Sequence, residues 1–175
     1  MAPGITVWIT GLPAAGKTTL ALAVQARLAE GARPAIVLDG DDLRGGLSRD
    51  LDHSRAGRRE NVRRAAEAAA LIAGQGAIVV VSLVAPYRAD RDAARRLHER
   101  ARIAFAEVWV ATPAAECARR DPKGLYRRAA AGELTGLTGW DDPYEEPRAA
   151  EAVVLPMAAG DGIAVVERLV RNRLG

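Results

Sequence analysis

Short apolar segments alternate with longer amphipathic or alanine-rich segments along the chain. The apolar segments are rich in Val and Ile, which predicts strands at 5–10, 34–38, 77–83, 103–110 and 152–155. Helical patterns lie between them, at 18–30, 58–74, 90–100, 113–120 and 162–174. This alternation, with short connections, favours a three-layer α/β/α fold around a central, mostly parallel sheet. The unbroken apolar run at 78–81 agrees, because strands of such sheets are buried on both faces.

The segment 121–151 departs from this alternation. It is rich in residues that break regular structure, namely Gly124, Gly132, Gly136, Gly139, Pro143 and Pro147. A connection of this length in a compact domain is usually either a functional lid or disordered. Trp140 and Tyr144 argue against disorder, so we expect a lid. At 175 residues, the chain suits one domain that spans 1–175.

Composition narrows the class of protein. Hydrophobic residues make up 49% of the chain but aromatic residues only 4%, so the core must be aliphatic. The 25 basic and 22 acidic residues give a net charge of +3, and many arginines occur in pairs. These pairs are either solvated helix faces or a basic rim for a small polyanion. Nucleic acid is not an expected partner, because no aromatic residues interleave with the basic ones.

The cysteine and histidine content and the hydropathy of the chain exclude further classes of protein. The one cysteine, Cys117, rules out an intrachain disulfide and is expected to be buried on a helix. His53 and His98 are too isolated to predict a metal site. No signal-peptide pattern and no apolar run of about 18 residues is present. We therefore expect a cytoplasmic protein without a membrane partner.

The segment after the first predicted strand carries the most specific motif, GLPAAGKT at 11–18. Two glycines separated by four residues, followed by Lys and Thr, form a phosphate-loop pattern. The backbone N–H groups of such a turn and the start of the following helix attract an anion. Lys17 can reach the β- and γ-phosphates of a nucleoside triphosphate, and the Thr18 hydroxyl can ligate magnesium. The alternative is a glycine-rich turn with an exposed lysine.

A second polar segment follows the next strand. Ligands of open α/β sheets bind beyond the carboxyl ends of the strands, where Asp39, Asp41 and Asp42 surround Gly40. Such carboxylates suit water-mediated magnesium contact or the orientation of an attacking hydroxyl. An Asp-rich turn that caps a helix is the alternative, and the sequence leaves both open.

The helix predicted at 58–74 begins with RRENVRR. Helical spacing places residues 58, 61 and 62 on one face and residues 60, 63 and 64 on another. Arg44, Arg58 and Asn61 could therefore form a fork-like site for a phosphate or sulfate group. Arg59 and Arg63 are expected to be solvated.

Three further motifs complete the set: APYRADRD, RRDPKGLYRRAAAGE and LTGWDDPYEEP. Together with GLPAAGKTT, LDGDDLR and RRENVRR, they resemble the motifs of the adenylylsulfate kinase family and occur in the same order. The resemblance extends from about residue 5 to residue 156. The resemblance implies a P-loop NTPase-type fold and phosphorylation of the ribose 3′-hydroxyl of adenosine 5′-phosphosulfate by MgATP. The product, 3′-phosphoadenosine 5′-phosphosulfate, is activated sulfate. The resemblance also implies a homodimer.

The resemblance implies a role for each matching position. The phosphate loop would hold ATP, through Gly11, Ala14, Ala15, Gly16, Lys17, Thr18 and Thr19, and Thr18 would ligate magnesium. Asp41 would act as the base or orienter of the acceptor hydroxyl, with Lys17 and Lys123 as the other catalytic residues. The acceptor nucleotide would be bound by Asp39, Arg44, His53, Arg58, Asn61, Pro86, Tyr87, Arg88, Lys123, Gly124, Leu125, Leu137 and Thr138. The segment 121–139 would form a lid over both substrates, which would exclude water from the transfer.

Four positions depart from the family's usual pattern. Ala85 stands where the family usually has Ser, so a phosphoserine intermediate is impossible and we predict direct in-line transfer. His53 and Leu137 replace two Phe residues whose rings are expected to sandwich the substrate adenine. The loss of a stacking ring costs about 1–3 kcal/mol per base in single-strand binders. Gly57 replaces an Asp.

These departures lie on the acceptor side and keep two alternatives open. One is a kinase with the same donor chemistry and a different nucleotide or small-metabolite acceptor. The other is a non-catalytic nucleotide-binding regulator, against which the intact Lys17, Thr18 and Asp41 argue.

Overall fold

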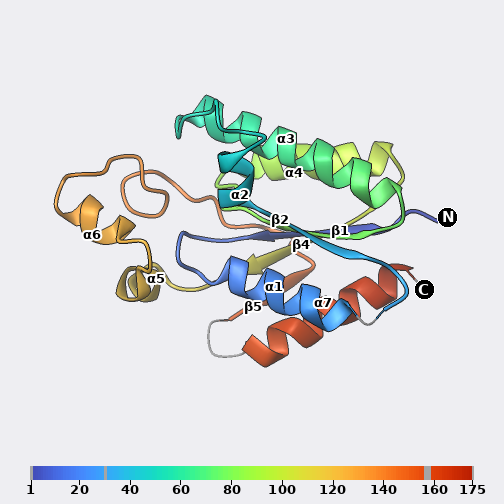
Figure 1. The fold of residues 1–175 in the computed structure, drawn as a ribbon. Helices are drawn as coiled ribbons and strands as arrows, with labels where there is room; N and C mark the ends of the chain where they lie inside the picture. Colours follow the sequence, from blue (N-terminus) through green and yellow to red (C-terminus); the bar gives the residue numbers. More distant parts are fainter. Residues whose placement is uncertain (1, 30, 156–158, 175) are drawn as a thin grey trace.

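A five-stranded parallel sheet forms the centre of the computed structural model, which describes residues 2–29, 31–155 and 159–174 (Figure 1). The strand order is β2-β3-β1-β4-β5. The strands are β1 (Ile5–Thr10), β2 (Ala35–Asp39), β3 (Ile78–Ser82), β4 (Ala104–Val110) and β5 (Ala152–Val154). All four pairings are parallel, which confirms the predicted sheet.

Helices cover both faces of this sheet. α3 (Arg55–Gly74) and α4 (Arg88–Arg100) pack together on one face, and α1 (Lys17–Leu28) and α7 (Ala159–Leu174) on the other (Figure 1). The short helices α2 (Gly40–Gly45), α5 (Ala114–Arg120) and α6 (Leu125–Ala130) lie toward the carboxyl ends of the strands. The protein therefore has a three-layer α/β/α fold around a parallel sheet, as expected.

The central strand serves two cores. Because alternate side chains of a strand point to opposite faces, Ile5, Val7 and Ile9 pack with α1 and α7, whereas Trp8 packs with α3 and α4. The sheet-facing side of α3 is mostly alanine, which lets this helix lie close to the strands. The strand register places Ile9 and Asp39 opposite Ser82 at the carboxyl edge, where chemistry is expected.

Two helices were not predicted from the periodicity. α2 is too short to show a repeat, and it starts because the Asp39 side chain accepts a hydrogen bond from the Asp41 backbone N–H. α6 interrupts the segment 121–151, and its first two N–H groups after Leu125 donate to the Asp121 carboxylate. None of the helices that the structure describes is long and apolar enough to cross a membrane.

Candidate active site

A cavity of about 670 Å³ lies at the carboxyl ends of the central strands. Its walls come from the phosphate loop, the β2–α2 turn, the start of α3, the loop after β3 and the segment 120–138. These are the segments in which the sequence predicted chemistry. The fold thus brings distant parts of the chain to one site.

The phosphate loop wraps around the Lys17 side chain. Lys17 is 9% exposed, and its Nζ donates a 2.7 Å hydrogen bond to the Leu12 carbonyl inside the loop. Burial lowers the pKa of Lys17 to about 8, so the ammonium group is still mostly charged at pH 7. Gly16, at the start of α1, has a φ of 103°, a region that favours glycine. The loop therefore has the conformation and the cation that a triphosphate requires.

Two hydroxyl side chains hold backbone carbonyls of the phosphate loop. The Thr112 hydroxyl, after β4, donates to the Ala15 carbonyl at 2.8 Å, and the Tyr126 hydroxyl of α6 donates to the Pro13 carbonyl at 3.1 Å. Cys117 on α5 is fully buried nearby, as predicted, and burial raises the pKa of its thiol. These contacts hold the loop against β4 and the lid segment.

Thr18 and Asp39 meet beside the loop. The Thr18 hydroxyl donates a 2.7 Å hydrogen bond to Asp39 Oδ2, while Asp39 Oδ1 caps α2. Asp39 therefore caps a helix, as one interpretation of the Asp-rich turn predicts, and its role beside magnesium stays a prediction. Hydroxyl and carboxylate oxygens are ligands that Mg²⁺ prefers, so this pair fits magnesium. Within the described ranges, no group of three or more His, Cys, Asp or Glu side chains could hold a metal.

Asp41 and Lys123 meet at the mouth of the cavity. Asp41 comes from the first turn of α2 and Lys123 from the turn before α6. The Lys123 Nζ contacts Asp41 Oδ2, and the two side chains are 56% and 69% exposed. The predicted base is therefore already paired with a cation of the lid segment.

Arg44, Arg58 and Asn61 line the same cavity, as predicted. Arg44 donates to the Leu51 and Asp52 carbonyls at 3.1 Å each, so its guanidinium is held in a fixed direction. Arg58 donates to the His53 carbonyl at 2.9 Å and to the Gly136 carbonyl at 2.6 Å, which joins α3 to the lid segment.

Asn61 carries the clearest sign of a missing ligand. This residue is 5% exposed, yet its side-chain oxygen has no hydrogen-bond partner in the structure. Buried polar atoms are nearly always partnered, so an unpaired one in a cavity indicates a ligand contact. On the opposite face of α3, Arg63 and Arg64 pair with Glu60, as the helical spacing predicts.

His53 and Leu137 both line the cavity. Burial, with the nearby Arg44 and Arg58, lowers the pKa of His53, so its ring is neutral at pH 7. Leu137 is 6% exposed and offers an aliphatic surface. At Gly57, a Cβ atom would lie 2.3 Å from the Asp52 carboxylate, so this chain has no room for the family's usual Asp there.

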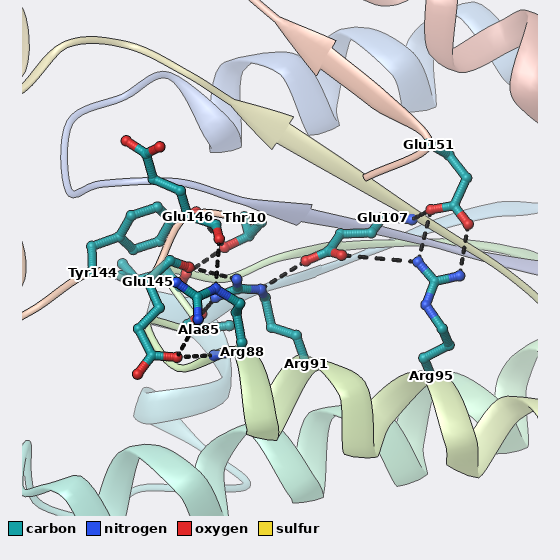
Figure 2. A network of polar contacts seen from close by, with 11 residues as sticks. Thr10, Ala85, Arg88, Arg91, Arg95, Glu107, Tyr144, Glu145, Glu146 and Glu151 are labelled. Atoms are coloured by element: carbon teal, nitrogen blue, oxygen red, sulfur yellow. Dashed lines mark hydrogen bonds and ion pairs between the residues drawn. The ribbon is translucent and has the colours of Figure 1, made fainter. Parts of the chain in front are cut away.

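The remaining predicted residues divide into two groups. Those that line the cavity are Ala14, Thr19, Pro86, Leu125 and Thr138. Those outside its lining are Gly11, Ala15, Tyr87, Arg88 and Gly124. Arg88 contacts the end of the lid region instead, where its backbone N–H donates to the Glu145 carboxylate and its Nε to the Glu146 carbonyl, both at 2.9 Å (Figure 2).

Sequence reasoning missed Arg120 and Ser82, which also line the cavity. Arg120 lies beside the phosphate loop, within 3.5 Å of the Ala15 carbonyl. It belongs to one of many arginine pairs, and the signal that could have identified it is its place after the fourth strand, in the motif RRDPKGLYRRAAAGE. Ser82 ends β3, and its buried hydroxyl has no partner in the structure.

The chain is similar to adenylylsulfate kinases along most of its length. A family model described as adenylylsulphate kinase matches residues 3–155. An adenylyl-sulfate kinase of Geotalea uraniireducens is 44% identical over 171 residues, which are 97% of this chain and 81% of that protein. An adenylyl-sulfate kinase of Saccharomyces cerevisiae is 45% identical over 148 residues, 85% of this chain and 73% of that protein.

A solved structure agrees with these relatives. The Mycobacterium tuberculosis APS kinase CysC in complex with AMPPNP and APS superposes with a TM-score of 0.90 at 43% identity, over 95% of this chain and 99% of that one. The fold, the motifs in their order and these similarities lead to one assignment. The chain belongs to the adenylylsulfate kinase family.

Proposed function

We propose that this protein transfers the γ-phosphoryl group of ATP to the 3′-hydroxyl of adenosine 5′-phosphosulfate. The observation that carries the proposal is the position of α2 in the cavity wall. At its start Asp39 contacts Thr18 of the phosphate loop, its first turn carries Asp41, and its last turn carries Arg44. One short helix thus connects a donor side, a candidate base and an anion-binding side.

The donor side consists of the phosphate loop with Lys17, Thr18 and Arg120. Its backbone amides and two cations suit the phosphates of ATP. Thr18 and Asp39 would hold magnesium, which would neutralise negative charge on the phosphates of ATP. Arg120 adds a guanidinium to this side of the cavity.

The acceptor side consists of Arg44, Arg58 and Asn61 with His53 and Leu137. Two arginines held by backbone carbonyls form a preorganised site for a phosphosulfate group. The neutral His53 ring and the Leu137 side chain would contact the adenine. The full set of substrate-binding residues predicted from the sequence stays a prediction.

Transfer then depends mainly on position and charge. Asp41 would accept the hydroxyl proton or orient the hydroxyl for in-line attack, and Lys123 would leave Asp41 to neutralise charge on the transferred group. Ala85 has no hydroxyl, so the phosphoryl group passes directly from donor to acceptor. The lid segment, within 121–151, would cover both substrates and exclude water.

A second candidate function is phosphorylation of a different nucleotide or small-metabolite hydroxyl. The observation that favours it is the cavity position of His53 and Leu137, where the family usually has two Phe residues. Both functions share the donor side, so only the acceptor distinguishes them.

The test is incubation of the purified protein with MgATP and adenosine 5′-phosphosulfate, in parallel with a panel of other nucleotides and hydroxyl acceptors. Mass spectrometry of the products is expected to show 3′-phosphoadenosine 5′-phosphosulfate at the highest turnover. Transfer to another acceptor, with none to adenosine 5′-phosphosulfate, would support the second function. The expected homodimer stays a prediction, which sedimentation velocity would test.

A further inference from the structure

Arg91, on α4, is a buried cation that joins three separate segments. Its side chain is 2% exposed. Its Nε donates to Glu107 Oε1 at 2.7 Å, its Nη1 to the Ala85 carbonyl at 2.7 Å and its Nη2 to the Glu145 carbonyl at 2.6 Å (Figure 2). A buried charge is costly unless it is paired and hydrogen-bonded, and here each nitrogen of the guanidinium has a partner. The planar guanidinium presents donors on three separate nitrogens in one plane, a geometry that the single tetrahedral nitrogen of lysine cannot reproduce.

The first of the tethered segments is a wall of the active site. Ala85 lies in the loop after β3 that lines the cavity, and its φ of 42° is unusual for a residue with a side chain. Such a conformation persists only where the surroundings hold it. The hydrogen bond from Arg91 to the Ala85 carbonyl is one of the contacts that hold it.

The second tethered segment is the end of the lid region. Glu145 is bound by Arg91 through its carbonyl, and its own backbone N–H donates to the Pro86 carbonyl at 2.8 Å. Next to it, the Tyr144 hydroxyl lies 3.0 Å from the Thr10 hydroxyl, which donates to the Val84 carbonyl at 2.6 Å. The residue before the phosphate loop, the loop after β3 and the end of the lid region therefore form one hydrogen-bonded unit.

The third contact anchors this unit to the sheet. Glu107 belongs to β4, where its side chain is 10% exposed. The Glu107 carboxylate fixes the orientation of the Arg91 guanidinium relative to β4. The hydrogen bonds from Arg91 to the Ala85 and Glu145 carbonyls therefore hold both segments against the sheet. Arg95, one turn further along α4, forms two hydrogen bonds with the Glu151 carboxylate at 2.6 and 2.8 Å and a longer ion pair of 3.8 Å with Glu107 Oε2 (Figure 2). Arg95 forms no hydrogen bond with the Ala85 loop or with Glu145 among the described residues.

We propose that Arg91 is a positioning residue for phosphoryl transfer, because it fixes the end of the lid to the acceptor-side loop. Because Arg91 holds the end of the lid region at Glu145, only the part of the lid before this residue moves. The cavity wall at Ala85 and Pro86 stays in place when the acceptor binds. The tether itself is independent of which acceptor is used. The identity of the acceptor in the kinetic part of the test rests on the proposed function.

The test compares Arg91→Lys and Arg91→Gln with Arg95→Gln as the matched control. For the folded Arg91 variants we expect KM for adenosine 5′-phosphosulfate to rise, and kcat to fall, by about 10- to 100-fold, because small misplacements in a transfer site have effects of this size. ATP binding, measured by calorimetry, should stay close to that of the wild type. Hydrogen exchange should increase in peptides that contain residues 84–86 and 144–146. Arg95→Gln should lower Tm without these effects.

A double variant separates positioning from folding. Arg91→Met/Glu107→Met removes both buried charges, and such replacements of a buried ion pair are often tolerated. It should fold yet show the same kinetic and exchange changes. The inference would be overturned by any folded variant without the arginine that keeps the hydrogen-exchange rates of the wild type at 84–86 and 144–146 and an unchanged KM for the acceptor. If the wild type does not use adenosine 5′-phosphosulfate, the proposed function fails, but the exchange comparison still decides the role of Arg91.

Discussion

The Thr18 hydroxyl donates a 2.7 Å hydrogen bond to Asp39 Oδ2, which links the first turn of α1 to the end of β2. The other carboxylate oxygen of Asp39 accepts from the Asp41 backbone N–H and so begins α2. One carboxylate therefore couples the position of the nucleotide loop to the helix that carries the candidate base. Asp39 therefore contacts both the phosphate loop on the donor side and the helix α2 that leads to the acceptor side.

Asp39→Asn should weaken the response to magnesium. The amide oxygen can still cap α2, but the negative charge beside Thr18 is lost. We expect the Mg²⁺ concentration for half-maximal rate to rise about tenfold, which corresponds to about 1.4 kcal/mol. Steady-state rates over a magnesium titration measure this. Asp42→Asn is the control, because Asp42 is exposed and outside the cavity lining, and an equal shift in both variants would argue against the role of Asp39.

Asp41→Asn should remove most of the turnover while leaving the nucleotide bound. The loss of a general base typically costs about 10²- to 10⁴-fold in rate. Asp41 is exposed at the mouth of the cavity, so its replacement should not change the fold. Quenched single-turnover assays and ATP calorimetry together measure the effect. Turnover near that of the wild type would show that Asp41 neither deprotonates nor orients the acceptor.

Leu137→Phe should tighten the acceptor site. Leu137 is buried in the cavity wall, and an aromatic ring there would add stacking against the base. Stacking is worth about 1–3 kcal/mol per base, so we expect KM for adenosine 5′-phosphosulfate to fall at least about fivefold. Leu47→Phe, at an exposed position outside the cavity lining, is the control. A raised or unchanged KM would contradict the stacking argument.

Gly139→Ala should lift the lid from the phosphate loop. Gly139 has a φ of 85°, and a Cβ there would lie 2.4 Å from Leu12 Cδ2. Gly132 has a similar φ of 74°, but no atom lies within 4 Å of its Cβ position. Gly132→Ala therefore introduces the backbone strain without a steric clash and serves as the control. We expect a larger loss of kcat/KM for ATP in Gly139→Ala, measured on both variants. Equal losses would mean that the contact with Leu12 does not position the lid.

His98 should make stability depend on pH. Its ring is fully buried, with Nδ1 2.8 Å from the Ala94 carbonyl and Nε2 2.9 Å from the Thr6 hydroxyl. The carbonyl can only accept, so Nδ1 donates to it and a neutral ring accepts from Thr6. Burial lowers the pKa of His98 in the folded protein. Below pH ~6.5 the unfolded chain therefore binds a proton that the folded protein does not, and stability falls.

Urea unfolding at several pH values measures this effect. The slope from His98 is at most about 1.4 kcal/mol per pH unit, in the window between its lowered pKa and about 6.5. The His98→Gln variant should lack this part of the pH dependence of stability. The pKa of His53 is also lowered, but His53 contributes equally to the pH dependence of both proteins. Identical slopes in the two proteins would show that His98 takes up its proton in the folded state.

Much of the site could be predicted from the chain alone, because its signals are local. The phosphate loop needs glycine, lysine and threonine at a fixed spacing, and the face shared by Arg58 and Asn61 follows from helical geometry. Asp39 was predicted both as a helix cap and as a site carboxylate, and the structure shows it capping α2 beside Thr18. For Arg88 the structure shows that the side chain binds the Glu146 carbonyl, a contact that the sequence did not indicate, and its contact with the substrate stays a prediction.

The sequence by itself determined the alternation of strands and helices, the buried or exposed faces and the identity of the phosphate loop, since each depends on neighbouring residues. Tertiary structure alone decided that Lys123 reaches Asp41 across 82 positions and that Arg91 binds the ends of two distant loops. Such contacts depend on strand order and on how the lid returns to the sheet. Arg91 looks like any other arginine of an amphipathic helix in the sequence, and only its burial in the folded protein distinguishes it from the more exposed arginines of α4.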